Sequence, residues 1–449
     1  MKNRFAYFSI LVVVISCFIV NNQFKNWKNE SAVILGEVKR YYGFLPAKYI
    51  YKDLKIDKSE YFYTPGNSWF EQTVYPNGKK DFGKTYGFAL MYSPFFFAAD
   101  FCATYFHLPD NGFSEPYRYF LLLGTIFYLL IALDFIRKIL KKLNINEWVI
   151  GITILLLGLG TNVLIYATYL APSPYIPELF LTSLFVYFTI CWHEEKKRWY
   201  LVPVLLSFSI LTVIDFSDAF IVLFFILYGT KDILEFSEKK INPGIILSAL
   251  VFMFLIWMPQ FQFWKLTTDS YLGLKDHSRQ YFFMNPKFFS VFFSFNKGWL
   301  IYTPLMIFSI LGIRSMWKTF TFLRWSVVLS VVFCLYLLAS SCCLEQDSAF
   351  SQPFMIKSYA LLAIPLSLMI KKITESSLVI QGLLIIAILF FSGLNVFQIY
   401  QYHTESLLHT NMTSSIYFKQ FGKIEPYFES EILNSKLDSL ESNIINANY

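Results

Sequence analysis

The chain has 449 residues, of which 55% are hydrophobic, 20% aromatic and only 15% charged, and its formal net charge is +7. A soluble domain carries about a quarter charged residues. This composition therefore excludes a water-soluble domain, an intrinsically disordered chain, a coiled coil and a soluble nucleic-acid-binding protein. Nearly uncharged runs long enough to cross a bilayer recur along the chain, which predicts an all-α polytopic membrane protein.

The first apolar run, 5–20, follows Lys2 and Arg4, and no small-residue cleavage site comes after it. It is predicted to be an uncleaved signal anchor with a cytoplasmic N-terminus. Ten further apolar runs bring the predicted number of spans to eleven. They are 117–136, 148–168, 178–192, 199–214, 217–229, 244–262, 298–316, 325–340, 356–370 and 378–400.

One more apolar run, 86–106, is long enough to span the membrane but contains Pro94 and Asp100. If it spans, every later loop is inverted and the positive-inside rule fails. If it does not, the loops rich in Lys and Arg all fall on the cytoplasmic side: 137–147, 193–198, 230–243, 314–324 and 371–377. We therefore expect 86–106 to be a helical hairpin or an interfacial helix on the outer side.

This topology predicts a transmembrane domain over 1–400 and an outer tail over 401–449. Two large outer loops, 21–116 and 263–297, interrupt the spans, and the first is expected to hold juxtamembrane helices. The sequence contains no Walker motif and no G-x-G-x-x-G. Nucleotide-driven chemistry on the inner side is therefore not expected.

In this topology, candidate functional residues gather on the outer side, and ionisable groups near the membrane suggest function. Glu37 lies just beyond the first span. It is either a solvated carboxylate paired with Lys39 or Arg40, or a general base whose pKa is raised by partial desolvation. Asp215 and Asp218 lie in a very short outer turn. They either cap the following helix or contribute to an acceptor or metal site, although two carboxylates fall short of a divalent-cation site.

The second outer loop carries Arg279 and Lys297 among many aromatic residues. These cations either anchor the loop at the membrane interface or bind the phosphate of a lipid whose isoprenoid tail lies beside the spans. Cys342 and Cys343 are adjacent and are expected to be free thiols, since a vicinal disulfide would be strained. The spacing of the Cys and His residues predicts no metal site.

Four segments resemble motifs of the bacterial integral-membrane glycosyltransferases of the GT-C superfamily, in the branch related to protein mannosyltransferases and lipid A aminoarabinose transferase. They are YYGFLPAKYIYKD at 41–53, YGFALMYSPFF at 86–96, FSFNKGWLIYTPL at 293–305, and LLH with MT in 407–413. The order and spacing of these segments carry the resemblance. It implies a GT-C-like fold, a polyprenyl-phosphate sugar donor, inversion at the anomeric carbon and an acidic base just after the first span.

Carried onto this sequence, the resemblance places Glu37 at the family's acidic base and Lys297 at a family lysine. Other polar positions depart from the family pattern. Arg279 stands where an acidic residue is usual, Asp215 where the family has an arginine, and Pro353 where it has another arginine. The apolar scaffold is kept while polar positions change, which implies a different donor or acceptor, or a loss of activity.

The leading hypothesis is an inner-membrane glycosyltransferase that moves a sugar from a polyprenyl-phosphate donor to a periplasmic glycan, lipid or protein hydroxyl. Its N-terminus is expected in the cytoplasm and its C-terminus in the periplasm. The expected site comprises Glu37 as base, Lys297 and Arg279 as phosphate ligands, and Asp215, Asp218, Tyr42 and Asp53 as candidate substrate or acceptor contacts. The alternative is an inactive scaffold or lipid-binding subunit of an envelope assembly. A transporter is disfavoured, because transporters place polar groups at the midplane of repeated halves.

Overall fold

The computed structural model describes residues 4–30, 32–55, 63–64, 67–68, 70–71, 73–75, 78–232, 242–273, 280–341 and 349–427. In these residues, six helices are long and apolar enough to cross a membrane by length and composition: α1 (Phe5–Phe24), α5 (Glu115–Lys142), α8 (Tyr175–Glu195), α11 (Pro243–Thr268), η7 with α16 (Pro353–Thr374) and α17 (Leu378–His403). Four shorter apolar helices accompany them: α6 (Glu147–Leu159), η4 with α9 (Arg198–Ile214), η5 with α10 (Phe216–Leu227) and α15 (Arg324–Ser340). The predicted all-α polytopic class is confirmed, and the number of spans stays a prediction.

The remaining elements are mostly short and lie between the long helices. The helical ones are η2 (Asn26–Lys28), α2 (Glu37–Tyr42), α3 (Phe44–Tyr49), α4 (Gly87–Tyr105), α7 (Val163–Tyr166), α12 (Phe288–Phe293), α13 (Trp299–Tyr302), α14 (Met306–Thr319) and α18 (Ser414–Gln420). Three of the apolar helices begin with a 3-10 turn: η4 (Arg198–Tyr200) precedes α9 (Leu201–Ile214), η5 (Phe216–Ile221) precedes α10 (Val222–Leu227), and η7 (Pro353–Ser358) precedes α16 (Tyr359–Thr374). Two antiparallel strand pairs complete the list: β1 (Tyr63–Thr64) with β2 (Asn67–Ser68), and β3 (Thr73–Val74) with β4 (Lys80–Asp81).

Local sequence explains where several helices begin and end. The Asn146 side chain accepts a hydrogen bond from Trp148 N–H and caps α6, and Asn242 caps α11 in the same way. The predicted span 298–316 is divided, because α13 ends before Pro304 and α14 begins after it. Proline has no N–H to donate and restricts the residue before it, so the helix breaks there.

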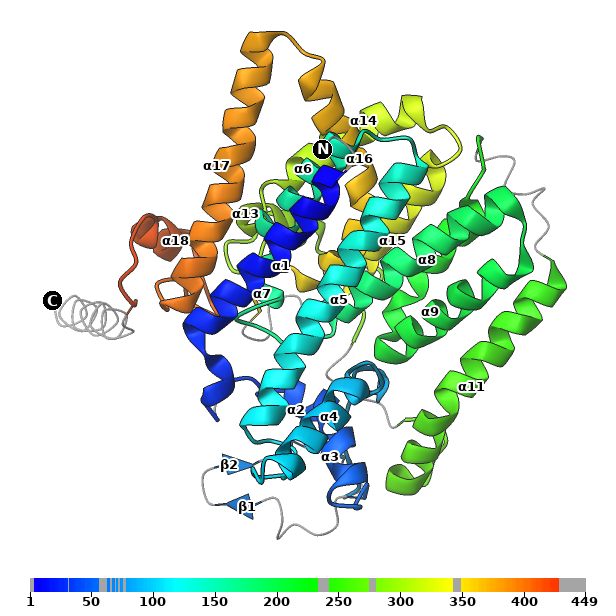
Figure 1. Ribbon diagram of the computed structural model, residues 1–449, viewed down its shortest axis with the longest axis vertical. Helices are drawn as coiled ribbons and strands as arrows, with labels where there is room; N and C mark the ends of the chain where they lie inside the picture. Colours follow the sequence, from blue (N-terminus) through cyan, green and yellow to red (C-terminus); the bar gives the residue numbers. More distant parts are fainter. Residues whose placement is uncertain are drawn as a thin grey trace, which may run out of the picture.

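The described parts of the loops rich in Lys and Arg lie at one end of the molecule, where α1 begins (Figure 1). Lys142 forms an ion pair with Glu194 at 2.8 Å, which joins the ends of α5 and α8. The Gly229 N–H donates to Phe322 O at 2.9 Å, which joins the loops that follow α10 and α14. The opposite end holds α2, α3 and α4 (Figure 1), and we call it the α2–α4 end. It corresponds to the predicted outer side, and which side of a membrane it faces stays a prediction.

The two predicted outer loops meet at the α2–α4 end. Lys79, from the first loop, forms an ion pair with Asp269 just beyond α11 (2.5 Å) and donates to Thr268 O (3.0 Å). The rings of Phe44 and Phe263 lie 4.7 Å apart between centroids. Within the molecule, the first loop and the start of the second therefore lie on the same side, as the predicted topology requires.

The run 86–106 forms a single helix, α4, so the alternative of a helical hairpin is wrong. This helix continues through Pro94 and lies at the α2–α4 end (Figure 1). It packs on α5, where Tyr117 donates to Asp100 Oδ1 at 2.5 Å and the Tyr128 hydroxyl donates to Met91 O. Asp100, which made this run ambiguous as a span, is thus satisfied by a tyrosine of the neighbouring helix.

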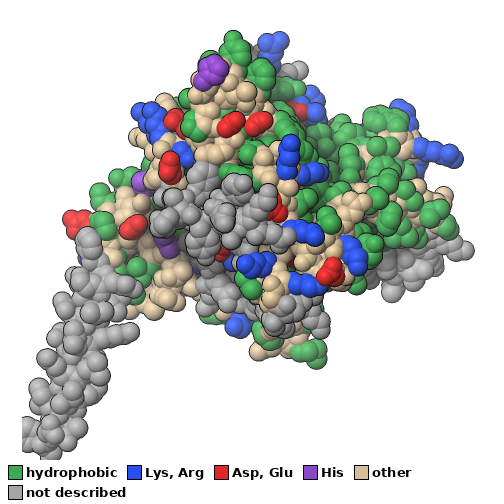
Figure 2. Space-filling view, turned by 90° about the horizontal axis from the view of Figure 1, so that it is seen from below, with side chains coloured by type: hydrophobic (Ala, Val, Ile, Leu, Met, Phe, Trp, Pro, Cys, Tyr) green, Lys and Arg blue, Asp and Glu red, His purple; other side chains and the backbone are tan. Residues whose placement is uncertain are grey.

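The core of the bundle is built from closely packed helices, whereas α11 and α17 lie at its outside. At Gly312 of α14 an added Cβ would come within 2.0 Å of the Pro365 carbonyl oxygen of α16, so only glycine allows this approach. The long helices α11 and α17 instead expose many apolar side chains, as a lipid-facing helix does; among them are Leu247, Phe254, Leu383 and Ile386. Seen from the α2–α4 end, charged side chains of both signs lie over the middle of the molecule (Figure 2).

Candidate functional site

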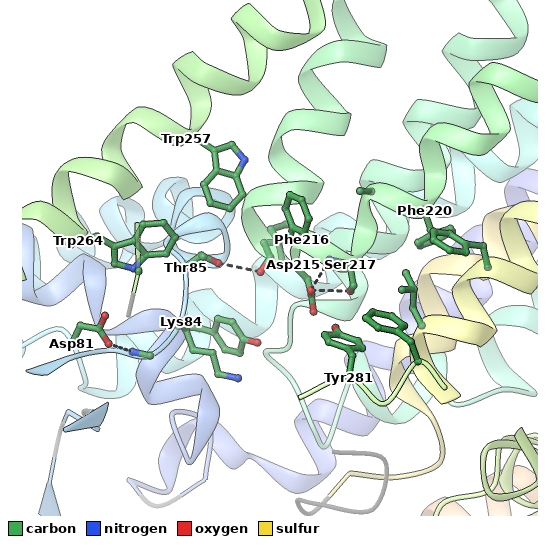
Figure 3. A pocket seen from close by; sticks show the side chains of 18 of the residues that line it. Asp81, Lys84, Thr85, Asp215, Phe216, Ser217, Phe220, Trp257, Trp264 and Tyr281 are labelled. Atoms are coloured by element: carbon green, nitrogen blue, oxygen red, sulfur yellow. Dashed lines mark hydrogen bonds between the residues drawn. The ribbon is translucent and has the colours of Figure 1, made fainter. Parts of the chain in front are cut away.

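A cavity of about 550 Å³ opens at the α2–α4 end. Its described lining comes from Tyr41 of α2, the β3–β4 hairpin with 83–85, the turn 214–220 between α9 and α10, helix α11 with Gly273 beyond it, and the segment 281–283 with α15. Figure 3 shows the labelled side chains gathered around it: Asp81, Lys84, Thr85, Asp215, Phe216, Ser217, Phe220, Trp257, Trp264 and Tyr281. Some of these groups are charged or carry hydroxyls, and the others are large and aromatic.

The turn after β4 places Lys84 at the cavity. The buried Asp81 accepts hydrogen bonds from the Tyr75 hydroxyl (3.0 Å) and from Gly83 N–H (2.6 Å). Gly83 has φ +62°, and an added Cβ would lie 2.2 Å from the Thr73 hydroxyl oxygen. Glycine is therefore required at this turn, and the turn carries the chain directly into Lys84.

The residues after Lys84 are fastened to two helices. The Thr85 hydroxyl donates to Ile214 O at the end of α9 (3.1 Å). The Tyr86 N–H donates to the buried Gln260 side chain of α11 (2.8 Å). These bonds hold the Lys84 segment between α9 and α11.

The turn after α9 supplies a second polar group. Asp215 lies just beyond Ile214, and its Oδ1 accepts from Ser217 N–H (3.0 Å) and from the Ser217 hydroxyl (2.8 Å). The capping alternative is thus confirmed for Asp215, which also lines the cavity beside Ser217 (Figure 3). Asp218 belongs to the same turn but is buried and is not among the described lining residues.

The aromatic lining of the cavity includes two tryptophans of α11. Trp257 donates its indole N–H to the Thr212 hydroxyl (3.2 Å), and its ring lies 6.2 Å from that of Trp264. Phe216 packs edge-on against Trp257. Such a wall suits an apolar or ring-shaped ligand group, because aromatic faces offer large contact areas.

Glu37 is joined to the cavity through Lys84. Glu37 is the first residue of α2, and its Oε1 lies 2.5 Å from Lys84 Nζ. The Lys84 ammonium also lies 5.0 Å from the ring centroid of Tyr41. The Glu37 side chain is 44% exposed and that of Lys84 only 7%, so Glu37 is open to water while its partner is largely enclosed.

Neither of the two predicted phosphate ligands is among the described residues that line this cavity. Lys297 is buried in the turn that precedes α13. Tyr302 fixes that turn by donating to Phe295 O at 2.5 Å, and the ring of Tyr417 packs against Phe295. Arg279 lies outside the described residues.

Tyr42 and Asp53, the remaining predicted contacts, lie on either side of α3. Tyr42 is fully buried and donates to Gly112 O at 2.5 Å. Burial is the main cause that raises the pKa of Tyr42 well above its ordinary value, and the neighbouring Tyr117 adds to it. Asp53 is half-buried, and its N–H donates to Ala47 O (2.9 Å). In this geometry Tyr42 ties α2 to the loop before α5.

The sequence analysis missed a buried lysine. Lys357 lies in η7, its ammonium donates to Asp218 Oδ1, and Glu178 Oε2 lies 3.8 Å from the same nitrogen. Lys357 lies within a predicted span, 356–370, where a lysine at membrane depth is costly unless it is paired. That rule could have identified it. Lys84 was also missed, although it lies only two positions before the motif at 86–96.

The described residues contain no group of three or more His, Cys, Asp or Glu side chains placed to hold a metal ion. Cys102 is a free thiol, while Cys342 and Cys343 lie outside the described residues. A carboxylate, an ammonium and hydroxyl groups beside aromatic rings can bind a phosphate or a sugar and can move a proton.

No protein-family model matches the chain, and no curated protein matches it in sequence. Among solved structures, the chain is similar to the Archaeoglobus fulgidus oligosaccharyltransferase in its apo form, with a TM-score of 0.55 and 12% sequence identity. The match covers 95% of this chain and 60% of that chain, so this chain spans about three fifths of the archaeal enzyme's length. At this identity the likeness concerns the fold alone. The chain is a membrane protein whose fold is similar to that of the archaeal oligosaccharyltransferase.

Proposed function

We propose that the protein is a membrane glycosyltransferase that moves a sugar from a polyprenyl-phosphate donor to a hydroxyl of a periplasmic glycan, lipid or protein, with inversion. One observation carries the proposal. The cavity joins aromatic groups on α11, a helix with an exposed apolar surface, to a polar wall that includes Lys84, the partner of Glu37. A lipid-linked sugar likewise joins an apolar tail to a polar head of phosphate and sugar. In this proposal the protein lies in the inner membrane with its N-terminus in the cytoplasm and its C-terminus in the periplasm.

The two parts of the donor have separate places in the cavity. The isoprenoid tail runs past Phe216, Phe283 and Phe333, which line the cavity and are exposed, and its contact with them removes apolar surface from water. The donor phosphate binds Lys84, the one Lys or Arg among the described residues that line the cavity. Lys297 and Arg279 remain proposed as further phosphate ligands.

Glu37 acts as the general base. Its carboxylate is held by Lys84 in the structure, and a donor phosphate would compete for the same ammonium. Binding of the donor therefore leaves Glu37 available to take the proton of the acceptor hydroxyl. The acceptor oxygen bonds to the anomeric carbon as that proton moves. The bond from this carbon to the phosphate oxygen breaks, the phosphate keeps the electron pair, and Lys84 stabilises the negative charge.

The test compares two glutamates of the same outer loop. Glu37→Gln should lower the rate of sugar transfer by about a hundredfold or more, because general-base catalysis contributes about 10²–10⁴-fold. Glu71→Gln is the matched control, since Glu71 also pairs with a basic residue, Arg40 (2.6 Å), and is 39% exposed. Transfer is measured with purified protein and a polyprenyl-phosphate sugar, and folding by thermal unfolding. Near-normal transfer by a folded Glu37→Gln protein contradicts the assignment.

An inactive lipid-binding scaffold is the second candidate. Among the described residues that line the cavity, two carboxylates, Asp81 and Asp215, accompany one ammonium, that of Lys84, which Glu37 already engages. A cavity with this charge balance favours phosphate less than a strongly basic one does. Tight binding of a polyprenyl-phosphate sugar without transfer or hydrolysis would favour the scaffold, whereas turnover favours the enzyme.

A further inference from the structure

A second group of charges lies behind the polar wall of the cavity, and the proposed chemistry does not use it. It consists of Glu178 on α8, Asp218 on η5 and Lys357 on η7, each at most 2% exposed. Lys357 donates to Asp218 Oδ1, and Glu178 Oε2 lies 3.8 Å from the same ammonium. Three distant parts of the chain therefore meet at one buried ammonium, and we call this group the buried cluster.

The buried cluster contains more negative than positive groups. Asp215 also lies close enough to act electrostatically on both Lys357 and Asp218, so three carboxyl groups lie near one ammonium. The other described neighbours that face Lys357 are the thiol of Cys334 on α15 and the ring of Phe354, whose centroid lies 3.5 Å from Nζ. Carboxylates in an enclosed place repel one another unless a cation lies among them. Lys357 is the cation that allows the turn to carry two aspartates.

The turn that holds Asp218 also forms the cavity wall. The Asp218 N–H donates to Asp215 O at 2.9 Å, and Asp215 in turn holds Ser217 through two hydrogen bonds. Asp215, Ser217 and Phe220 line the cavity, while Asp218 points to Lys357. One side of a six-residue turn thus faces the ligand space and the other is fixed by a buried ion pair.

We propose that Lys357 is a positioning residue for substrate binding. By holding Asp218, it fixes the 215–220 turn so that Asp215 and Ser217 present a carboxylate and a hydroxyl to the hydroxyl groups of the donor sugar. This inference rests on the proposed function, in which the cavity receives the lipid-linked sugar. Lys357 itself does not touch the ligand, and its effect reaches the ligand only through the turn.

The experiment removes one charge from the buried cluster while keeping the shape of the side chain. Asp218→Asn should raise KM for the polyprenyl-phosphate sugar about tenfold and change kcat less than about threefold, because only ground-state positioning is altered. Asp134→Asn is the matched control, since Asp134 pairs with Arg137 (2.8 Å) and Lys138 (2.8 Å) on α5, away from the cavity lining. It should leave both constants unchanged. Lys357→Arg, which keeps the charge, should restore most of the affinity that Lys357→Met loses.

Amide hydrogen exchange tests the positioning without any transfer assay. In the unaltered protein, amides 217–221 should exchange as slowly as those of α9, and in Asp218→Asn they should exchange about tenfold faster. If the turn exchanges as fast as the exposed Lys52 and Lys55 in the unaltered protein, or if Asp218→Asn leaves KM unchanged, the proposal is overturned. A protein that shows the exchange pattern but transfers no sugar keeps the positioning role and rejects the proposed function.

Discussion

Two lysine–carboxylate pairs of this protein use the same chemistry in opposite surroundings. Lys84 and Glu37 meet at the rim of the cavity, where Glu37 is 44% exposed, whereas Lys357 and Asp218 are enclosed by the bundle. An exposed pair contributes about 0–1 kcal/mol and can exchange partners. Removing one member of a buried pair costs about 3–5 kcal/mol. The comparison teaches that burial decides whether a charge pair is available for chemistry or serves to hold the structure.

The largest expected effect comes from breaking the buried pair. Lys357→Met should lower the free energy of unfolding by about 3–5 kcal/mol, because Asp218 and Glu178 are left buried without their cation. Lys371→Met is the control on the same helix, since Lys371 is 53% exposed and pairs at 3.9 Å with Glu375. Denaturant unfolding in detergent measures both variants. If both variants lost the same free energy of unfolding, burial would not distinguish the two kinds of pair.

Breaking the rim pair should affect binding more than stability. Lys84→Met is expected to weaken binding of a polyprenyl phosphate about tenfold or more, because the phosphate loses its charge-assisted partner. The free energy of unfolding should change by about 1 kcal/mol or less, since water can solvate the exposed Glu37. Binding is measured by calorimetry beside Lys80→Met, a change at an exposed lysine of the adjacent strand. Unchanged binding in Lys84→Met would assign the phosphate to another part of the protein.

A third pair, Lys79 with Asp269, extends the comparison to a carboxylate that is 77% exposed. The hydrogen bond from Lys79 lowers the pKa of Asp269 below its ordinary value. The pair therefore stabilises the fold above the unfolded pKa of about 3.9, and this contribution is lost as the pH falls through the lower, folded value. Thermal unfolding of Asp269→Asn and of the unaltered protein should differ slightly and equally from pH 8 to pH 5, and converge at lower pH. A difference that grows between pH 8 and pH 5 contradicts this assignment.

Much of the fold could be predicted because it depends on patterns that are local in the sequence. Long apolar runs and the positions of Lys and Arg predicted the helices and the two ends of the molecule. For the ambiguous run 86–106, charge placement favoured an interfacial element over a span, whereas the choice between a hairpin and a single helix needed the structure. The break of the predicted span 298–316 into two helices could also be predicted, since Pro304 lies within it.

The candidate site was harder to predict because its groups come from distant segments. Glu37 was identified from its place after the first span, but no local pattern indicates that Lys84 is its partner. Asp218 was singled out as an interruption of an apolar stretch, while its partner Lys357 lies 139 positions away. A charged residue inside an apolar run indicates that it has a partner of opposite charge. Only the packing of the helices shows which residue that partner is.

The stretch from Lys79 to Tyr86 has a mechanical consequence. It is tied to the end of α11 through Asp269 and to its middle through Gln260, and between these ties it carries the ammonium that holds Glu37. A tilt of α11 would therefore move its two tryptophans at the cavity and the Lys84 segment together. Admission of a long-chain ligand and release of the Glu37 carboxylate would then both result from the same movement of α11.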